Sequence, residues 1–198
     1  MKSLALRWPF LVPRAARDTP HAPPDEPRFR PLPRAAIRWI GPQNSVALRP
    51  FEWNTDAETI CQWQRETYAL NFPSFRFTPE FAAAFRLDLR RATLDQNHGL
   101  FVLDDGPGGG GTCGFLWLVL CVNSWTSERY GYVNNIYVAP EKRGLHLAQE
   151  LLSHGELWFR SRRANRMRLT VTASNDAALH LYERSGFQTE RFEMEKEI

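Results

Sequence analysis

Proline is concentrated at the start of the chain, which limits where regular structure can form. Ten of the fourteen prolines lie within residues 1–50, and proline is excluded from helix interiors and central strands. Residues 1–45 hold eight Lys or Arg and three acids, whereas residues 46–198 hold seventeen and nineteen. We therefore predict a Pro- and Arg-rich, irregular or flexible arm over residues 1–45 and one folded domain over residues 46–198.

Composition excludes several protein classes. The length of 198 residues, 43% of them hydrophobic, corresponds to one soluble domain with a tail. No apolar run approaches the roughly 20 residues of a membrane helix, and Arg7 and Pro9 interrupt the apolar start before it becomes a signal-peptide core. Three cysteines without CxxC spacing argue against a disulfide framework or a zinc site. We expect a cytoplasmic protein that spans no membrane.

Strand and helix signals alternate from Val46 onward, which indicates an α/β fold. Residues 46–51 predict a short strand, and Thr55 with Glu58 forms a capping box that predicts a helix start. That helix runs to about Leu70. A second helix begins at Thr78-Pro79 and ends near Asp95, with four apolar residues at helical spacing: Phe81, Phe85, Leu89 and Ala92.

A glycine-rich segment separates two apolar strand candidates, residues 99–104 and 113–122. The glycine run lacks the Lys-Ser/Thr ending of a P-loop and leads into a strand, so we interpret it as a hairpin tip. Cys113 and Cys121 are eight residues apart on the second strand. We expect both on the same face, in the core.

The chemistry-bearing residues lie between residues 131 and 187. Residues 131–138 predict a strand that stops at Ala139-Pro140, and an amphipathic helix follows. Residues 143–148, Arg-Gly-Leu-His-Leu-Ala, are expected in the first turn of that helix, where unpaired N–H groups and the helix dipole favour phosphate. Residues 167–172 alternate as a strand. A capped helix then begins at Asn175 and ends at Gly186.

Three segments follow one another in the chain: strand 131–138, turn 143–148 and helix 175–187. Together and in this order they resemble the GCN5-related N-acetyltransferase (GNAT) superfamily. The resemblance covers residues 46–198 and is strongest from residue 131. It implies a mixed, mostly antiparallel central sheet with a splayed parallel strand pair and flanking helices. It also implies that acetyl-CoA binds where the two strands splay, and that a primary amine of a small molecule or a protein or peptide N-terminus attacks the thioester directly.

The resemblance also implies roles for single residues. The family's pyrophosphate motif, Arg/Gln-x-x-Gly-x-Gly/Ala, matches residues 143–148, with His146 where glycine is usual. We expect helical dihedrals to let His146 still present its N–H; its imidazole is either a solvated surface group or a phosphate contact. Tyr182 would protonate the departing thiolate. The implied cofactor-binding residues are Ile136, Tyr137, Val138, Arg143, Gly144, Leu145, His146, Leu147, Ala148 and Asn175.

The group that deprotonates the acceptor amine stays unassigned. Thr170 occupies the strand position where the N-terminal acetyltransferases that this segment resembles commonly have glutamate, and threonine is no base at neutral pH. Candidate replacements are Glu66, Glu128 and His98. A water chain, or an amine that is already partly neutral, is an equal alternative.

Partners are less constrained than the fold. Aromatic residues with nearby carboxylates suit a cationic amine, but they can equally be core: Trp63, Tyr68, Phe72, Phe75, Phe77, Trp125 and Tyr130. An arginine cluster at residues 160–168 fits a solvated helix end, and because residues 46–198 are net negative we predict no nucleic-acid binding. No metal is expected, and a homodimer stays open. The alternative functions are an acetyl-CoA-binding regulatory module with little turnover and a nucleic-acid-associated protein.

Overall fold

The computed structural model describes residues 38–41, 45–72, 75–105, 111–192, 194 and 196. Most of the predicted arm, residues 1–37 and 42–44, and the glycine-rich residues 106–110 lie outside the described residues. The elements, in chain order, are β1 (Arg38–Ile40), β2 (Val46–Pro50), α1 (Trp53–Asn71), α2 (Pro79–Ala92), β3 (His98–Asp104), β4 (Thr112–Val122), β5 (Arg129–Val138), the 3-10 helix η2 (Pro140–Lys142), α3 (Leu147–Arg160), β6 (Met167–Arg168) and α4 (Asp176–Arg184).

The strands form one six-stranded sheet in the order β1-β2-β3-β4-β5-β6. Neighbours from β1 to β5 are antiparallel, and only β5 and β6 are parallel. This confirms the predicted mixed sheet, mostly antiparallel with one parallel pair. β1 lies within the residues that the sequence analysis assigned to the arm, and it pairs with β2 through three residues.

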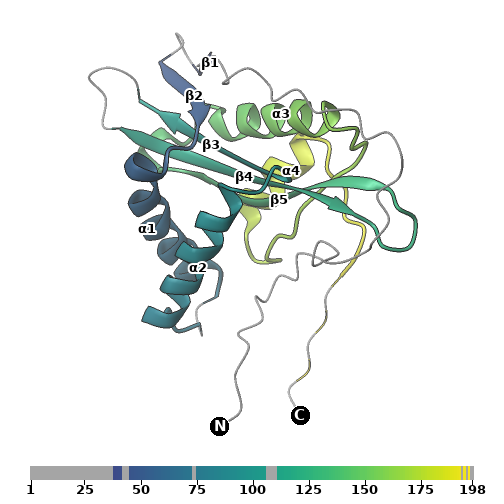
Figure 1. The fold of residues 1–198 in the computed structure, drawn as a ribbon, viewed down its shortest axis with the longest axis horizontal. Coiled ribbons are helices and arrows are strands. Elements are labelled where there is room, and N and C mark those ends of the chain that lie inside the picture. Colours follow the sequence, from purple (N-terminus) through teal and green to yellow (C-terminus); the bar gives the residue numbers. More distant parts are fainter. Residues whose placement is uncertain are drawn as a thin grey trace.

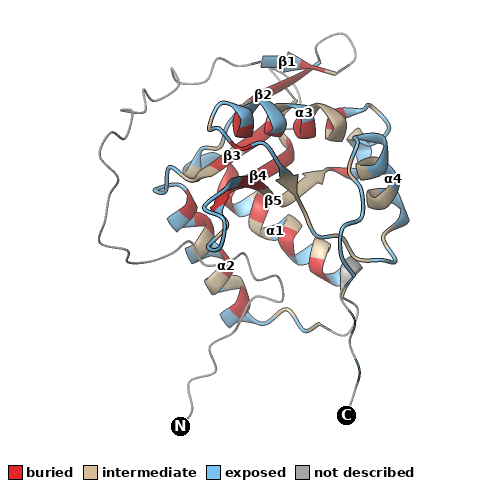
Figure 2. Ribbon diagram, turned by 90° about the vertical axis from the view of Figure 1, so that its right-hand side faces the viewer, coloured by how far each residue is buried: buried red, intermediate tan, exposed pale blue. Residues whose placement is uncertain are grey.

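Helices cover both faces of the sheet, with α3 on one face and α1 and α2 on the other (Figure 1). Each face has its own apolar cluster, so burial is highest along the central strands (Figure 2). On the α3 side, Leu118 packs with Leu151 and Phe159. On the α1–α2 side, Trp117 packs with Phe85. Alternate residues of β4 therefore enter opposite layers, as the period of a strand requires.

The start of α2 is as predicted, whereas the start of α1 is not. Thr78 Oγ1 accepts a hydrogen bond from Phe81 N at 3.2 Å, and the four predicted apolar residues of α2 are buried. α1 begins two residues before Thr55, and its N-cap, Glu52, makes no side-chain cap bond. Instead, Asp56 Oδ2 accepts from Glu52 N at 2.7 Å. The capping-box prediction for Thr55 was therefore wrong.

The prediction that Cys113 and Cys121 share a face was also wrong. Cys113 belongs to the α3-side cluster and Cys121 to the α1–α2-side cluster. The cause is a β-bulge: Leu103 pairs with Gly114 and Asp104 with Thr112, which leaves Cys113 without a partner on β3. One inserted residue reverses the alternation on one side of the bulge. None of the helices in the described ranges is long and apolar enough to span a bilayer.

Candidate active site

The parallel strands β5 and β6 stop pairing almost as soon as they meet. Their ladder consists of Gly131 with Met167 and Tyr132 with Arg168. Residues 133–138 of β5 continue without a strand partner on that side among the described residues, and the predicted strand 167–172 is a strand only over its first two residues. We call the region between residues 133–138 of β5 and residues 169–172 the wedge.

A second bulge shapes the β5 side of the wedge. Trp117 pairs with Asn135 and Leu118 with Val133, so Asn134 has no partner on β4. Beyond it, Ile136 and Val138 pack against the α3-side cluster. Asn135 Nδ2 donates to Gln64 Oε1 of α1 at 2.5 Å. Bulges often re-aim side chains beside active sites. Here the predicted backbone-binding residues, Ile136, Tyr137 and Val138, lie on the open edge of β5.

The turn between β5 and α3 is built differently from the prediction. Residues 143–146 form the turn and α3 begins only at Leu147. His146 is the N-cap, with φ 59° and ψ 13°, and Gly144 has φ 78°. The expectation of helical dihedrals at His146 was therefore wrong: both residues are left-handed, which explains why glycine suits these positions. The first-turn N–H groups of a helix lack intrahelical partners and favour an anion, and α3 presents this turn directly after the exposed His146.

Arg143 ties the turn to the end of β5. Its Nε donates to the carbonyl oxygen of Val138 at 3.1 Å, and its guanidinium lies 5.9 Å from the centre of the Tyr137 ring. Tyr137 in turn stacks on Trp63 of α1, with 4.6 Å between ring centres. The cationic residue of the turn is thus held beside the open edge of β5, where it can attract phosphate.

α4 brings the two predicted C-terminal site residues to the wedge. Asn175 caps the helix, because its Oδ1 accepts from Ala178 N at 3.1 Å. Tyr182 is half-buried and meets Phe187 edge-on at 5.7 Å between ring centres. Burial, and secondarily the charge that Tyr132 would carry, raises the pKa of Tyr182 to about 12. The phenol therefore keeps its proton throughout the neutral range, as a proton donor must.

Tyr132, which the sequence analysis did not select, bridges the wedge. Its hydroxyl donates to Thr170 Oγ1 at 3.0 Å, across the point where β5 and β6 separate. Burial raises the pKa of Tyr132 above its ordinary value. A strand pattern alone shows which face Tyr132 occupies but not which residue of another strand lies opposite, so the sequence carried no signal for this pair.

The three candidate bases lie in different surroundings. Glu66 Oε2 accepts from the Tyr137 hydroxyl at 3.0 Å. Glu128 is exposed in the β4–β5 turn and accepts from the Thr126 hydroxyl at 3.3 Å. His98 Nδ1 accepts from Trp117 Nε1 at 2.8 Å, and burial lowers the pKa of His98. His98 and Glu128 lie at the end of the sheet opposite the 143–146 turn.

The aromatic residues predicted as an acceptor wall separate into distinct groups. Trp63 stacks on Tyr137 of β5, whereas Tyr130 of β5 is buried in the α1–α2-side cluster and is therefore a core residue. Tyr68 belongs to an aromatic cluster that joins α1 to α2, and Trp125 is 94% exposed at the β4–β5 turn. In the arginine cluster, Arg160 pairs with Glu156 and Arg162 lies over the Trp158 ring.

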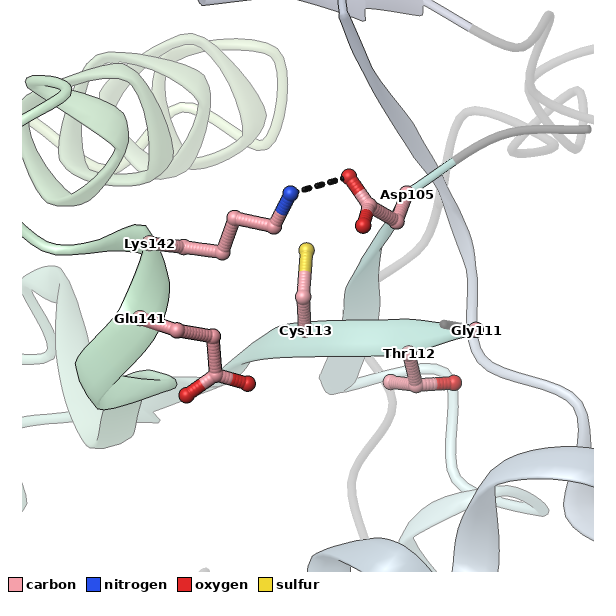
Figure 3. A pocket seen from close by; sticks show the side chains of 6 residues that line it. All are labelled: Asp105, Gly111, Thr112, Cys113, Glu141 and Lys142. Carbon is pink, nitrogen blue, oxygen red and sulfur yellow. Dashed lines mark hydrogen bonds and ion pairs between the residues drawn. The ribbon is translucent and has the colours of Figure 1, made fainter. Parts of the chain in front are cut away.

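A cavity of about 290 Å³ lies beside the start of β4 and η2 (Figure 3). Lys142 Nζ pairs with Asp105 Oδ1 at 2.5 Å across it. Burial, with the charge of Asp105, raises the pKa of Cys113 to about 11, so its thiol stays protonated. The cavity contains none of the predicted site residues. In the described ranges, no group of three or more His, Cys, Asp or Glu residues could hold a metal ion.

Comparison with known proteins identifies the family of the chain. The model of the acetyltransferase (GNAT) family matches residues 57–187, a range that begins within α1 and includes α2, α3, α4 and the wedge. The chain belongs to the acetyltransferase (GNAT) family.

Individual relatives cover most of the chain. A mycothiol acetyltransferase of Pseudarthrobacter chlorophenolicus is 29% identical over 160 residues, which are 79% of this chain and 45% of the relative. The chain thus spans about half the length of that curated relative. A Pyrococcus furiosus protein assigned as an acetyl transferase superposes with a TM-score of 0.60 at 25% identity, covering 76% of this chain and 99% of that one.

A third similarity concerns the fold alone. An aminoglycoside acetyltransferase from an uncultured soil metagenomic sample, solved in complex with sisomicin, superposes with a TM-score of 0.59 at 12% identity. The superposition covers 79% of this chain and 98% of that one.

Proposed function

We propose that this protein is an N-acetyltransferase that transfers the acetyl group of acetyl-CoA to a primary amine. The acceptor is a small molecule or a protein or peptide N-terminus. One observation carries the proposal: β5 and β6 stop pairing after two residue pairs, and β5 then leads through η2 and the 143–146 turn to the N-terminus of α3, which favours an anion. Membership of the acetyltransferase (GNAT) family supports it.

The residues present fit a thioester ligand with a pyrophosphate. The first-turn N–H groups of α3 and the Arg143 guanidinium would hold the pyrophosphate. Unpaired backbone groups on the β5 edge would hold the pantetheine arm and donate to the thioester carbonyl. The proposed binding residues are Ile136, Tyr137, Val138, Arg143, Gly144, Leu145, His146, Leu147, Ala148 and Asn175.

Acetyl-CoA supplies an activated acetyl group. The protein therefore has to align the amine, remove a proton from it and donate a proton to the departing thiolate. The wedge brings amine and thioester together, which lowers the entropic cost of the encounter. Tyr182, protonated at neutral pH, would donate its proton to the departing thiolate. No covalent intermediate with the protein is needed.

A regulatory acetyl-CoA-binding module with little turnover is the second candidate. One observation favours it: Thr170 stands where a carboxylate base is common among the N-terminal acetyltransferases that this segment resembles. A module of this kind would bind acetyl-CoA tightly and release no thiol with any acceptor.

Thiol release from acetyl-CoA across a panel of amines tests the proposal. A relative named for mycothiol and a structural neighbour bound to sisomicin make small-molecule amines the first choice, followed by polyamines and short peptides. We expect acceptor-dependent release that falls at least about 10-fold in Tyr182→Phe, because the proton donor is lost. Isothermal titration should show unchanged acetyl-CoA binding in this variant. Tight binding without turnover would favour the regulatory module, and no binding would contradict both.

A further inference from the structure

A pair of hydroxyl groups spans the narrow end of the wedge. Tyr132 is the last residue of β5 that pairs with β6, and Thr170 lies two residues beyond its partner, Arg168. Their hydroxyls are hydrogen-bonded at 3.0 Å, although the residues are 38 positions apart in the sequence. The two strands thus remain connected through side chains just beyond the last backbone pair.

The pair leads from the interior to the surface. Tyr132 is half-buried and packs against the α1–α2-side cluster, whereas Thr170 is exposed to solvent. Tyr182 lies close enough to Tyr132 for the charge of one phenol to affect the pKa of the other. Tyr182 packs against the α3-side cluster, and it is Tyr132 that has a hydroxyl partner reaching solvent.

One carboxylate lies beside this place, Glu190, and it forms an ion pair: its Oε2 is 3.8 Å from Nη2 of Arg168. Position 170 is threonine, Glu66 is bonded to Tyr137, and Glu128 lies in the β4–β5 turn. The amine nevertheless has to lose a proton when it becomes an amide. A hydroxyl chain can conduct a proton without holding a charge at neutral pH, because each oxygen accepts one proton while it donates another.

We propose that Tyr132 and Thr170 form a hydroxyl relay that carries the acceptor's proton from the wedge to solvent. The inference rests on the proposed N-acetyltransferase function. Tyr132 is the residue that would contact the amine, and Thr170 is a positioning residue that acts through it. The 3.0 Å separation lets either hydroxyl donate to the other, so a proton can pass from Tyr132 to Thr170.

Bonds and protons balance in the proposed reaction. The amine nitrogen forms the C–N bond while the C–S bond breaks and its electron pair leaves on sulfur. One N–H proton passes to the oxygen of Tyr132, the hydroxyl proton of Tyr132 passes to Thr170 Oγ1, and the hydroxyl proton of Thr170 passes to water. Tyr182 gives its proton to the sulfur and recovers one from solvent, so the products are the amide and the free thiol.

Three variants test the relay in single-turnover experiments, with the amine that the acceptor panel identifies. Thr170→Val keeps the shape of the side chain and removes the hydroxyl, and Tyr132→Phe removes the other hydroxyl. We expect each to slow acetyl transfer about 100-fold, in the range of general acid–base catalysis, with unchanged acetyl-CoA affinity. Thr170→Ser restores the hydroxyl and should recover the rate to within about threefold.

A matched control is Tyr130→Phe, which removes a phenol hydroxyl two residues away on the same face of β5 and should leave the rate within about twofold. In wild type the proton inventory in H2O/D2O mixtures should be curved, because several protons move together, and Thr170→Val should lose the curvature. A wild-type rate in Thr170→Val or Tyr132→Phe, or no recovery in Thr170→Ser, would overturn the relay. Absence of thiol release from the wild type with every amine would instead overturn the proposed function.

Discussion

His146 holds a backbone conformation that most side chains avoid. Its φ of 59° and ψ of 13° are left-handed, and it makes no side-chain cap bond to α3. For an L-residue this conformation costs about 1–2 kcal/mol, because Cβ approaches the carbonyl oxygen. Histidine is among the residues that tolerate it best. The turn therefore keeps its shape at the expense of stability.

Replacing His146 by glycine should stabilise the protein. We expect His146→Gly to raise the free energy of unfolding by about 1 kcal/mol, because the crowding at Cβ disappears and no cap bond is lost. Urea denaturation measures the change. His146→Ala, which keeps Cβ, is the control and should show no such gain; equal stability of the two variants would refute the strain argument.

At the level of elements, a buried carboxylate joins the end of β2 to the start of α1. Asp56 is 0% exposed and accepts hydrogen bonds from Arg49, from Glu52 N and from the Thr112 hydroxyl of β4. The Asp56 and Asp104 carboxylates raise the pKa of Arg49, so the guanidinium is charged at every accessible pH. Asp56 thus fixes α1 against two strands.

We expect Asp56→Asn to destabilise the protein by about 3 kcal/mol. Removing one partner of a buried pair is strongly destabilising, and the amide cannot accept all the bonds that the carboxylate accepts. Arg49 keeps its second ion pair, with Asp104 Oδ2 at 2.9 Å. Glu58→Gln is the control on the same helix. Glu58 also pairs with an arginine, Arg86, but the Glu58 side chain is 87% exposed. Exposed pairs contribute about 0–1 kcal/mol. Similar unfolding free energies for the two variants in urea would contradict the role of Asp56.

At the scale of the whole molecule, the layer between α3 and the sheet contains a titratable group. His154 of α3 meets the Phe101 ring of β3 edge-on at 4.4 Å between ring centres. Its Nε2 is buried without a hydrogen-bond partner among the described residues. Burial, and secondarily the charge of Arg38 of β1, lowers the pKa of His154 to about 4. Arg38 itself pairs with Glu150 of α3.

Acid should therefore weaken the fold through His154. Between about pH 6.5 and pH 4 the unfolded chain binds a proton at this residue and the folded chain does not, so stability falls as the pH falls through this range. We expect a loss on the order of 2 kcal/mol from this group. Thermal unfolding across the range should show a shallower slope in His154→Leu, with a residual slope from His98, whose pKa is also lowered. An unchanged slope would count against this assignment.

The sequence by itself determined the helices α2, α3 and α4, the central strands and the order of the site motifs. The Thr78 cap, the spacing of the buried residues of α2, the strand before the 143–148 turn and the Asn175 cap of α4 all lie where the local patterns predict. The physical reason is that capping, helical spacing and strand alternation depend on neighbours within a few positions. The mixed sheet was predicted from the resemblance of the ordered motifs to the GNAT superfamily, which the family match confirms.

Only the tertiary structure decided register and partners across the sheet. The unpaired Cys113 depends on how β4 meets β3, and the left-handed His146 depends on where α3 begins. Thr112 reaches Asp56 over 56 positions, and Tyr132 reaches Thr170 over 38. No local preference encodes such pairs, because they form only when the packing of both layers brings distant backbones into register. The pair from which we infer the relay was therefore visible only in the folded chain.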